Sequence, residues 1–125
     1  MAKSYYLDNA MLNAILLGVA YTSPVSIAVA LYTASPGPGG GGSEVTAGGY
    51  ARTAATFGSP SNGVISNNAS VTFPQATAAW GTIVAFALFD DSGNMLWYGN
   101  LTASKTINTG DQLTFAAGGL TVTET

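Results

Sequence analysis

Two adjacent carboxylates, Asp90 and Asp91, are the residues of this sequence whose types most readily suggest chemistry. They lie within FDDSGNMLWYG, residues 89–99, beside aromatic side chains. A carboxylate pair can hold a metal ion or share acid/base work. Neighbouring residues of a strand point to opposite faces, however, so two adjacent Asp side chains do not converge on one ion. Because Asp, Asn and Gly favour turns, the stretch predicts a hairpin turn over residues 90–94 with a solvated tip.

A glycine-rich run also contains the spacing GxGxxG, at Gly37, Gly39 and Gly42, after a predicted strand. A dinucleotide-binding loop of this kind needs a helix that starts directly after it, so that the helix N-terminus meets the phosphates. The following residues, SEVTAGGY, have no helical pattern, and no GK[ST] triplet is present. We therefore expect neither a nucleotide site nor any other cofactor.

The residue types that activate nucleophiles are missing from the chain. It has neither histidine nor cysteine, so Ser and Thr lack their commonest general base. Thiolate and imidazole metal sites are excluded for the same reason. No constellation of residues indicates an enzyme or a metal centre.

Charged residues make up only 7% of the 125 residues, where roughly 25% is usual. The three basic residues, Lys3, Arg52 and Lys105, are scattered along the chain. Nucleic-acid and anionic-membrane binding both need clustered cations, so neither partner is expected. The apolar run AILLGVAYTS is too short to span a bilayer. A surface with so little charge is covered either by neutral polar residues or by neighbouring subunits.

Residues 4–17 predict one N-terminal helix. Ser4 is a plausible N-cap. Leu7, Met11 and Ile15 repeat at four-residue spacing, and together with Leu12 and Leu16 beside them they form an apolar stripe. Two partners for this stripe remain open. It can pack on the sheet of its own chain, or it can dock on a neighbouring subunit.

The rest of the chain predicts short strands separated by turn residues. A Gly/Pro-rich segment, residues 35–49, has no periodicity and is expected to be a flexible loop. The apolar residues 82–89 predict a central strand with two buried faces. The face assignments are Ile83, Ala85, Ala87 and Phe89 on one side and Val84, Phe86 and Leu88 on the other. We predict a mainly β fold, an antiparallel β-sandwich or jelly-roll-like single domain over residues 1–125 with one N-terminal α-helix.

Several stretches resemble a family of small tailed-bacteriophage virion proteins that are labelled tail fibre or head decoration proteins. The likeness rests on YLDNAMLNAILLG, AYTSPVSIAVALYTASPG and GGYARTAATF, and on a long stretch from ASVTFPQATAAWG through FALFDDSGNMLWYG to GGLTVT. Within these stretches the ordered short motifs are Tyr50-Ala51-Arg52, Phe73-Pro74 and Trp80-Gly81. The resemblance covers nearly the whole chain and implies a structural protein without catalytic residues.

From this resemblance we expect a capsid decoration or cement protein that bridges major capsid subunits on the outer surface of the head. Decoration proteins of this size commonly form trimers, so a homotrimer is expected by analogy. The candidate contacts between subunits come from the helix stripe and the Gly/Pro-rich segment. They are Leu7, Met11, Ile15, Pro36, Pro38, Gly40 and Val45.

The alternative is a tail-associated or fibre protein that binds a host receptor, such as a glycan. Exposed aromatic side chains often line carbohydrate sites, which makes Trp97 and Tyr98 the candidate contacts, with Trp80 as a third. The competing interpretation is that all three aromatics pack in the core or across strands.

Overall fold

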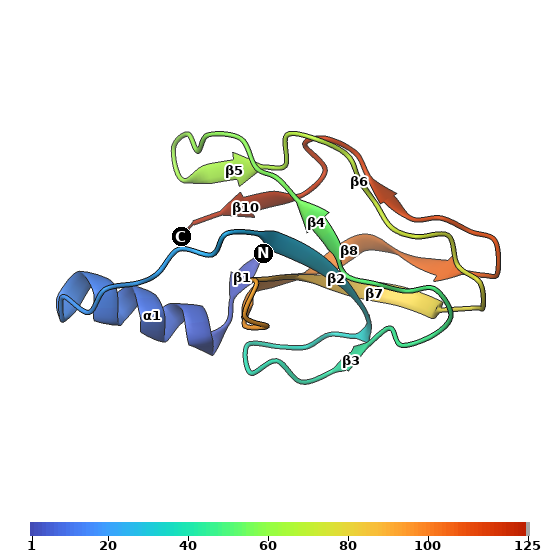
Figure 1. The fold of residues 1–125 in the computed structure, drawn as a ribbon, viewed down its shortest axis with the longest axis horizontal. Coiled ribbons are helices and arrows are strands. Elements are labelled where there is room, and N and C mark those ends of the chain that lie inside the picture. The colour runs from blue at the N-terminus through green and yellow to red at the C-terminus, as the bar shows by residue number, and fades with distance from the viewer. Residues whose placement is uncertain (125) are drawn as a thin grey trace.

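The computed structural model describes residues 1–124 and shows one helix with ten strands (Figure 1). The helix α1 is Tyr5–Leu16, near the N-terminus. The strands are β1 (Ala2–Lys3), β2 (Ile27–Ala34), β3 (Ser43–Glu44), β4 (Thr53–Ala55), β5 (Val64–Ser66), β6 (Val71–Thr72), β7 (Gly81–Phe89), β8 (Met95–Ile107), β9 (Thr114–Phe115) and β10 (Thr121–Thr123).

The largest sheet has the strand order β1-β8-β7-β2-β3, and β4 also pairs with β2. All its pairings are antiparallel, and Leu88 of β7 lies opposite both Val29 of β2 and Trp97 of β8. Two short antiparallel pairs, β5 with β10 and β6 with β9, lie outside this sheet. The mainly β, antiparallel, sandwich-like fold with one N-terminal helix is therefore confirmed.

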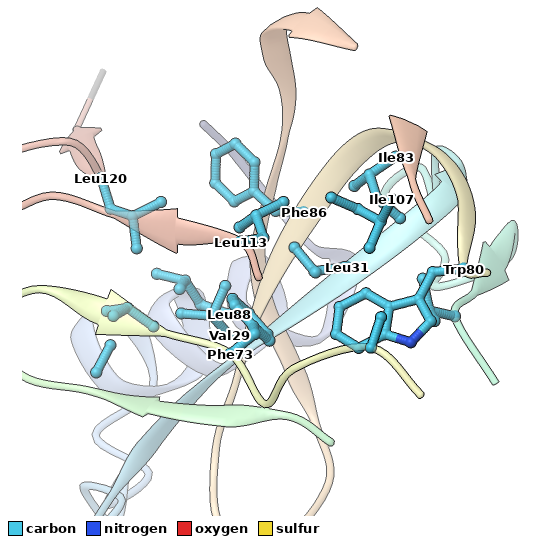
Figure 2. Close-up of a cluster of buried hydrophobic side chains, with 14 of the residues drawn as sticks. Val29, Leu31, Phe73, Trp80, Ile83, Phe86, Leu88, Ile107, Leu113 and Leu120 are labelled. Atoms are coloured by element: carbon cyan, nitrogen blue, oxygen red, sulfur yellow. The ribbon is translucent and has the colours of Figure 1, made fainter. Parts of the chain in front are cut away.

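The main core lies between the large sheet and the two short strand pairs. Figure 2 shows Val29, Phe73 and Leu88 close together within this cluster. Phe73 follows β6 and is fully buried. Its ring stacks on Tyr50 at 6.3 Å and meets Phe115 edge-on at 6.2 Å. The two short strand pairs form the second layer of the sandwich. The side chain of Phe73 connects this layer to Tyr50, which is bonded to Leu31 of β2 in the large sheet.

A β-bulge changes the predicted face assignments of β7. Between the pairs Ile83–Lys105 and Ala85–Asn100, a step of two residues in β7 faces a step of five in β8. Ile83 consequently packs in the main core, and Val84 packs on the opposite face with Ala85. The prediction was wrong for these two residues because strict alternation fails at a bulge. Their nearest neighbours along β7 follow the predicted alternation.

The opposite face of the sheet carries small side chains. Ala30, Ala85 and Ala87 are fully buried there, with Phe89 beside them. The Arg52 guanidinium lies 3.7 Å from the centroid of the Phe89 ring, a cation–π contact. Figure 1 shows the chain between β2 and β3 making a wide excursion at this side of the molecule.

The Gly/Pro-rich segment 35–49 has more structure than the sequence predicts. It contains β3, and both Pro36 and Val45 are buried. The Pro38 carbonyl accepts a hydrogen bond from the Tyr5 N–H at 2.9 Å, which ties the excursion to the start of α1. Gly42 has φ +73°, and a Cβ there would lie 2.4 Å from the Ala34 carbonyl oxygen. Backbone hydrogen bonds give this segment an order that its composition does not reveal.

A polar network fills the gap between β3 and β4 along the edge of β2. The Tyr50 hydroxyl accepts from the Leu31 N–H at 3.0 Å and donates to Glu44 Oε2 at 2.7 Å. Arg52 donates to both oxygens of Glu44, at 2.9 and 2.8 Å. Burial raises the pKa of Glu44, but hydrogen bonds from Arg52 and Tyr50 outweigh it and leave this pKa lowered. Burial and the bond to Glu44 raise the pKa of Tyr50, so the phenol stays protonated.

Candidate functional site

The Asp90–Asn94 segment is a hairpin turn between β7 and β8, as predicted. The Asp90 N–H donates to the Asn94 carbonyl at 3.0 Å, and Gly93 has φ +85°. Asp90 Oδ1 accepts from the N–H groups of Ser92 and Asn94, at 2.9 and 2.8 Å. Partial burial raises the pKa of Asp90, but the hydrogen bonds from Asn94 and Ser92 outweigh it and lower the pKa overall. The Asp90 carboxylate is therefore occupied in closing its own turn.

Asp90 and Asp91 form a matched pair for testing this assignment. Asp90→Ala is expected to lower the free energy of unfolding by about 1 kcal/mol, because the turn loses its side-chain acceptor. Asp91→Ala is expected to have almost no effect, since the Asp91 carboxylate accepts no hydrogen bond within residues 1–124. Urea denaturation of the two variants measures the difference. Equal losses in both would contradict the assignment.

The pH dependence has a definite sign. A carboxyl whose pKa is lowered by folding stabilises the protein above its unfolded pKa, roughly 4. This contribution of Asp90 is lost as the pH falls through its lowered folded pKa. The difference in stability between the wild type and Asp90→Ala should therefore shrink below about pH 4.

Neither the glycine-rich run nor the acidic residues within residues 1–124 form a phosphate or metal site. Gly37, Gly39 and Gly42 are followed by the strand β3 rather than by a helix, so the phosphate-binding arrangement does not form. Within residues 1–124, no group of three or more acidic side chains gathers to hold a metal ion.

The three aromatic candidates for glycan contact are separated by the fold. Trp80 is buried, and its indole N–H donates to the Gly48 carbonyl at 2.8 Å. Trp97 is partly buried against the main core, whereas Tyr98 packs on the opposite face of the sheet with Phe89. Trp97 and Tyr98 thus present no common stacking surface.

The candidate subunit contacts divide into buried and accessible residues. Leu7, Pro36 and Val45 are buried within the chain, so the structure does not leave them free for a neighbour. Leu7 lies in the first turn of α1, after the N-cap Ser4, whose hydroxyl donates to the Met95 carbonyl of β8. Met11 and Pro38 are partly buried. Ile15 and Gly40 are exposed.

Hydrogen bonds from Ser4 hold the N-terminus of helix α1 to strand β8 of the sheet. Ser4 is its N-cap, accepting from the Leu7 N–H at 3.1 Å and donating from its hydroxyl to the Met95 carbonyl of β8. Leu7 is the buried residue of the helix. The rest of α1 extends beyond the sheet, and the chain returns alongside it to β2 (Figure 1). We call α1 and this return, residues 5–26, the arm.

The arm exposes an unusual amount of apolar surface. Its large apolar side chains with more than half of their surface exposed are Leu12 (55%), Ile15 (73%), Leu16 (71%), Leu17 (73%), Val19 (53%) and Val25 (88%). Tyr5 is a further exposed aromatic, at 61%. No charged residue occurs between Asp8 and Glu44. Exposed apolar side chains gathered in one segment make the arm the candidate interaction surface.

The sequence pattern identified only part of this surface. It grouped Ile15 with Leu7 and Met11 in one stripe, although Leu7 faces the sheet and Ile15 faces outward. The stripe also included Leu12 and Leu16, and the residues that the pattern missed are Leu17, Val19 and Val25. The sequence did contain a signal for them. The apolar, uncharged chain after Asp8 continues beyond the end of the 12-residue helix, so one side of the helix cannot bury all of it on the sheet. No helix within the described residues is long and apolar enough to cross a membrane.

Comparison with known proteins identifies one family. The model of one protein family, described as podophage GP4 fiber I protein gp80, matches residues 2–123. No curated protein matches the chain. Since the match covers almost the entire sequence, this chain belongs to the podophage GP4 fiber I protein gp80 family and is a structural protein of the phage virion.

Proposed function

We propose that this protein is a fibre-type subunit of the podophage virion, and that its arm attaches the β-sandwich body to neighbouring virion chains. The exposed apolar arm is the observation that carries the proposal. The N-terminus of α1 is capped and bonded to β8, whereas the apolar residues of its C-terminal turns are exposed. This arrangement suits a connector between two rigid bodies. The fibre named in the family description supports a place among the tail-associated appendages.

The function proposed needs no catalysis. The body supplies a stable sandwich, and the arm supplies apolar surface that is removed from water on assembly. If the protein binds the assembled virion but not the separated virion proteins, its binding stabilises the assembly by mass action. No bound cofactor or metal enters this mechanism.

The arm tip, Leu17 and Val19, gives a direct test. The double variant Leu17→Ser/Val19→Ser is expected to reduce incorporation into virions about tenfold or more, since each 1.4 kcal/mol of lost binding is tenfold. Quantitative immunoblotting of purified particles, produced by phage lacking the wild-type gene, measures the incorporation.

The matched control for the tip variant is Val64→Ser, which removes an exposed apolar side chain from the body instead of the arm. Its incorporation should equal that of the wild type. Wild-type incorporation of the tip variant would contradict attachment through the arm.

A second candidate is a capsid decoration protein bound to the major capsid protein on the outer surface of the head. The described residues form a short sandwich body without an elongated shaft, which favours this role (Figure 1). The low charge also suits a subunit that covers a shell. Purified protein added to undecorated heads should then co-sediment with them and raise their disruption temperature. Binding to isolated tails but not to heads would reject the decoration role.

A further inference from the structure

A small apolar pocket lies in the sandwich body, between the large sheet and the β5–β10 pair. Its volume is about 140 Å³. The sheet contributes Leu88, Leu96 and Trp97 to its wall, and the strand pair contributes Ile65 and Val122. Every residue that lines the pocket is apolar, and no polar atom of the described residues is exposed on its wall. The pocket therefore offers a ligand apolar contacts from both layers and no hydrogen bond.

A second β-bulge forms the sheet side of this pocket. Leu88 of β7 pairs with Trp97 of β8, whereas the next residue, Phe89, pairs with Met95, so Leu96 is the extra residue of β8. Two successive residues of a bulged strand oppose one residue of its partner. Leu96 and Trp97 accordingly both line the pocket, where regular alternation would turn one of them to the other face.

The pocket is connected to the two layers but is also accessible from outside. Leu88, Leu96 and Val122 are buried, whereas Ile65 and Trp97 are only half-buried, which leaves a path for a ligand to enter.

An ion pair links the two layers next to the pocket. Lys3 of β1 lies opposite Trp97 in the register of the sheet, and Glu124 follows Val122 by two residues. The Lys3 ammonium lies 2.7 Å from Glu124 Oε1. Both charges are thus paired with each other, and neither is part of the pocket lining.

We propose that this pocket binds a small uncharged apolar molecule of about the size of one aromatic ring. Its size and lining select this class. A buried water needs two to four polar partners, whereas an apolar cavity of about 150 Å³ stays dry and binds benzene. A sugar or an ion would leave its polar groups unpaired against this wall. The site lies in the body, so the inference does not depend on attachment through the arm.

Titration of the wild-type chain with benzene provides the first test, followed by NMR of labelled methyl groups. The methyl signals of Ile27, Ile65 and Val122, which line the pocket, should shift along one saturating curve because the bound ring lies against them. The signals of Ile83 should stay in place, since Ile83 is buried in the same core but does not line the pocket. Glucose should shift none of these signals.

Neighbouring residues of β5 supply a matched pair of variants for the second test. Ile65 lines the pocket, whereas Val64 is exposed and does not. The larger ring of Ile65→Phe takes up the space of the ligand, so the affinity for benzene should fall at least about tenfold. Val64→Phe adds the same ring outside the pocket and should keep the wild-type affinity. Benzene should also raise the melting temperature of the wild type and of Val64→Phe but not of Ile65→Phe, because it binds the folded state.

Each test can overturn the inference. Methyl signals of Ile27, Ile65 and Val122 that do not respond to benzene would show that the pocket binds no apolar ring. Equal shifts at Ile83 would show binding without a defined site, and shifts with glucose would contradict the apolar class of ligand. Equal affinities of Ile65→Phe and Val64→Phe would place the site elsewhere. The wild-type titration needs no variant, so it decides the question even where Ile65→Phe folds poorly.

Discussion

Phe73→Ala is expected to lower the free energy of unfolding by about 4 kcal/mol, the largest effect of any single substitution proposed for this chain. Phe73 is fully buried, and its ring contacts Tyr50 and Phe115. Removing the ring leaves a cavity at the junction of the two layers, and the cost of this cavity adds to the lost burial of the ring. Since domains are stable by roughly 5–15 kcal/mol, the variant should be close to unfolding at physiological temperature.

Guanidinium denaturation followed by tryptophan fluorescence measures this effect. Phe73→Leu is the graded comparison, because it keeps much of the apolar volume and should lose less than half as much stability. A loss below about 1 kcal/mol for Phe73→Ala would contradict the packing of the second layer on the sheet.

Asn67→Ala is expected to cost about 3 kcal/mol, because it leaves several buried backbone groups without partners. Asn67 is 3% exposed. Its Nδ2 donates to the carbonyls of Ala69 and Ala116, both at 2.9 Å, and its Oδ1 accepts from the Leu120 N–H at 2.9 Å. One amide side chain thus joins the turn after β5 to the turn before β10. Its loss should loosen the C-terminal strands from the body.

Asn67→Asp tests the donors of this side chain separately from its shape. The carboxylate cannot donate to Ala69 and Ala116, so at neutral pH the loss should match or exceed that of Asn67→Ala. Protonation restores one donor, and stability should recover partly as the pH is lowered. Asn100→Ala is the matched control, since Asn100 is exposed and its side chain makes no hydrogen bond within residues 1–124. A stable Asn67→Ala variant would contradict the assigned network.

Local patterns predicted the parts of the fold that are decided locally. The turn at Asp90–Asn94 follows from Asp and Gly chemistry within five residues, and Ser4 caps α1 as its type predicts. The central position of β7 follows from its two apolar faces. Each of these features depends on residues close together in the chain.

Other features depend on distant pairings that no local pattern contains. The bulge opposite Ala85 arises where β8 accommodates extra residues, so the alternation around Ile83 and Val84 could not be read in advance. Pro36 is buried because the excursion between β2 and β3 folds back, held partly by the bond from Tyr5 to Pro38. The division of the α1 stripe into a buried Leu7 and an exposed Leu12 and Ile15 could not be predicted for a similar reason. Spacing alone does not say which side of a helix meets its own sheet.

A reconstruction of the intact virion would show directly whether the arm attaches this protein to its neighbours. We expect density for the sandwich body at a defined virion position, with the arm tip, Leu17 and Val19, buried against another virion chain. Copies whose arms stand apart in solvent, or particles that contain no such subunit, would contradict it.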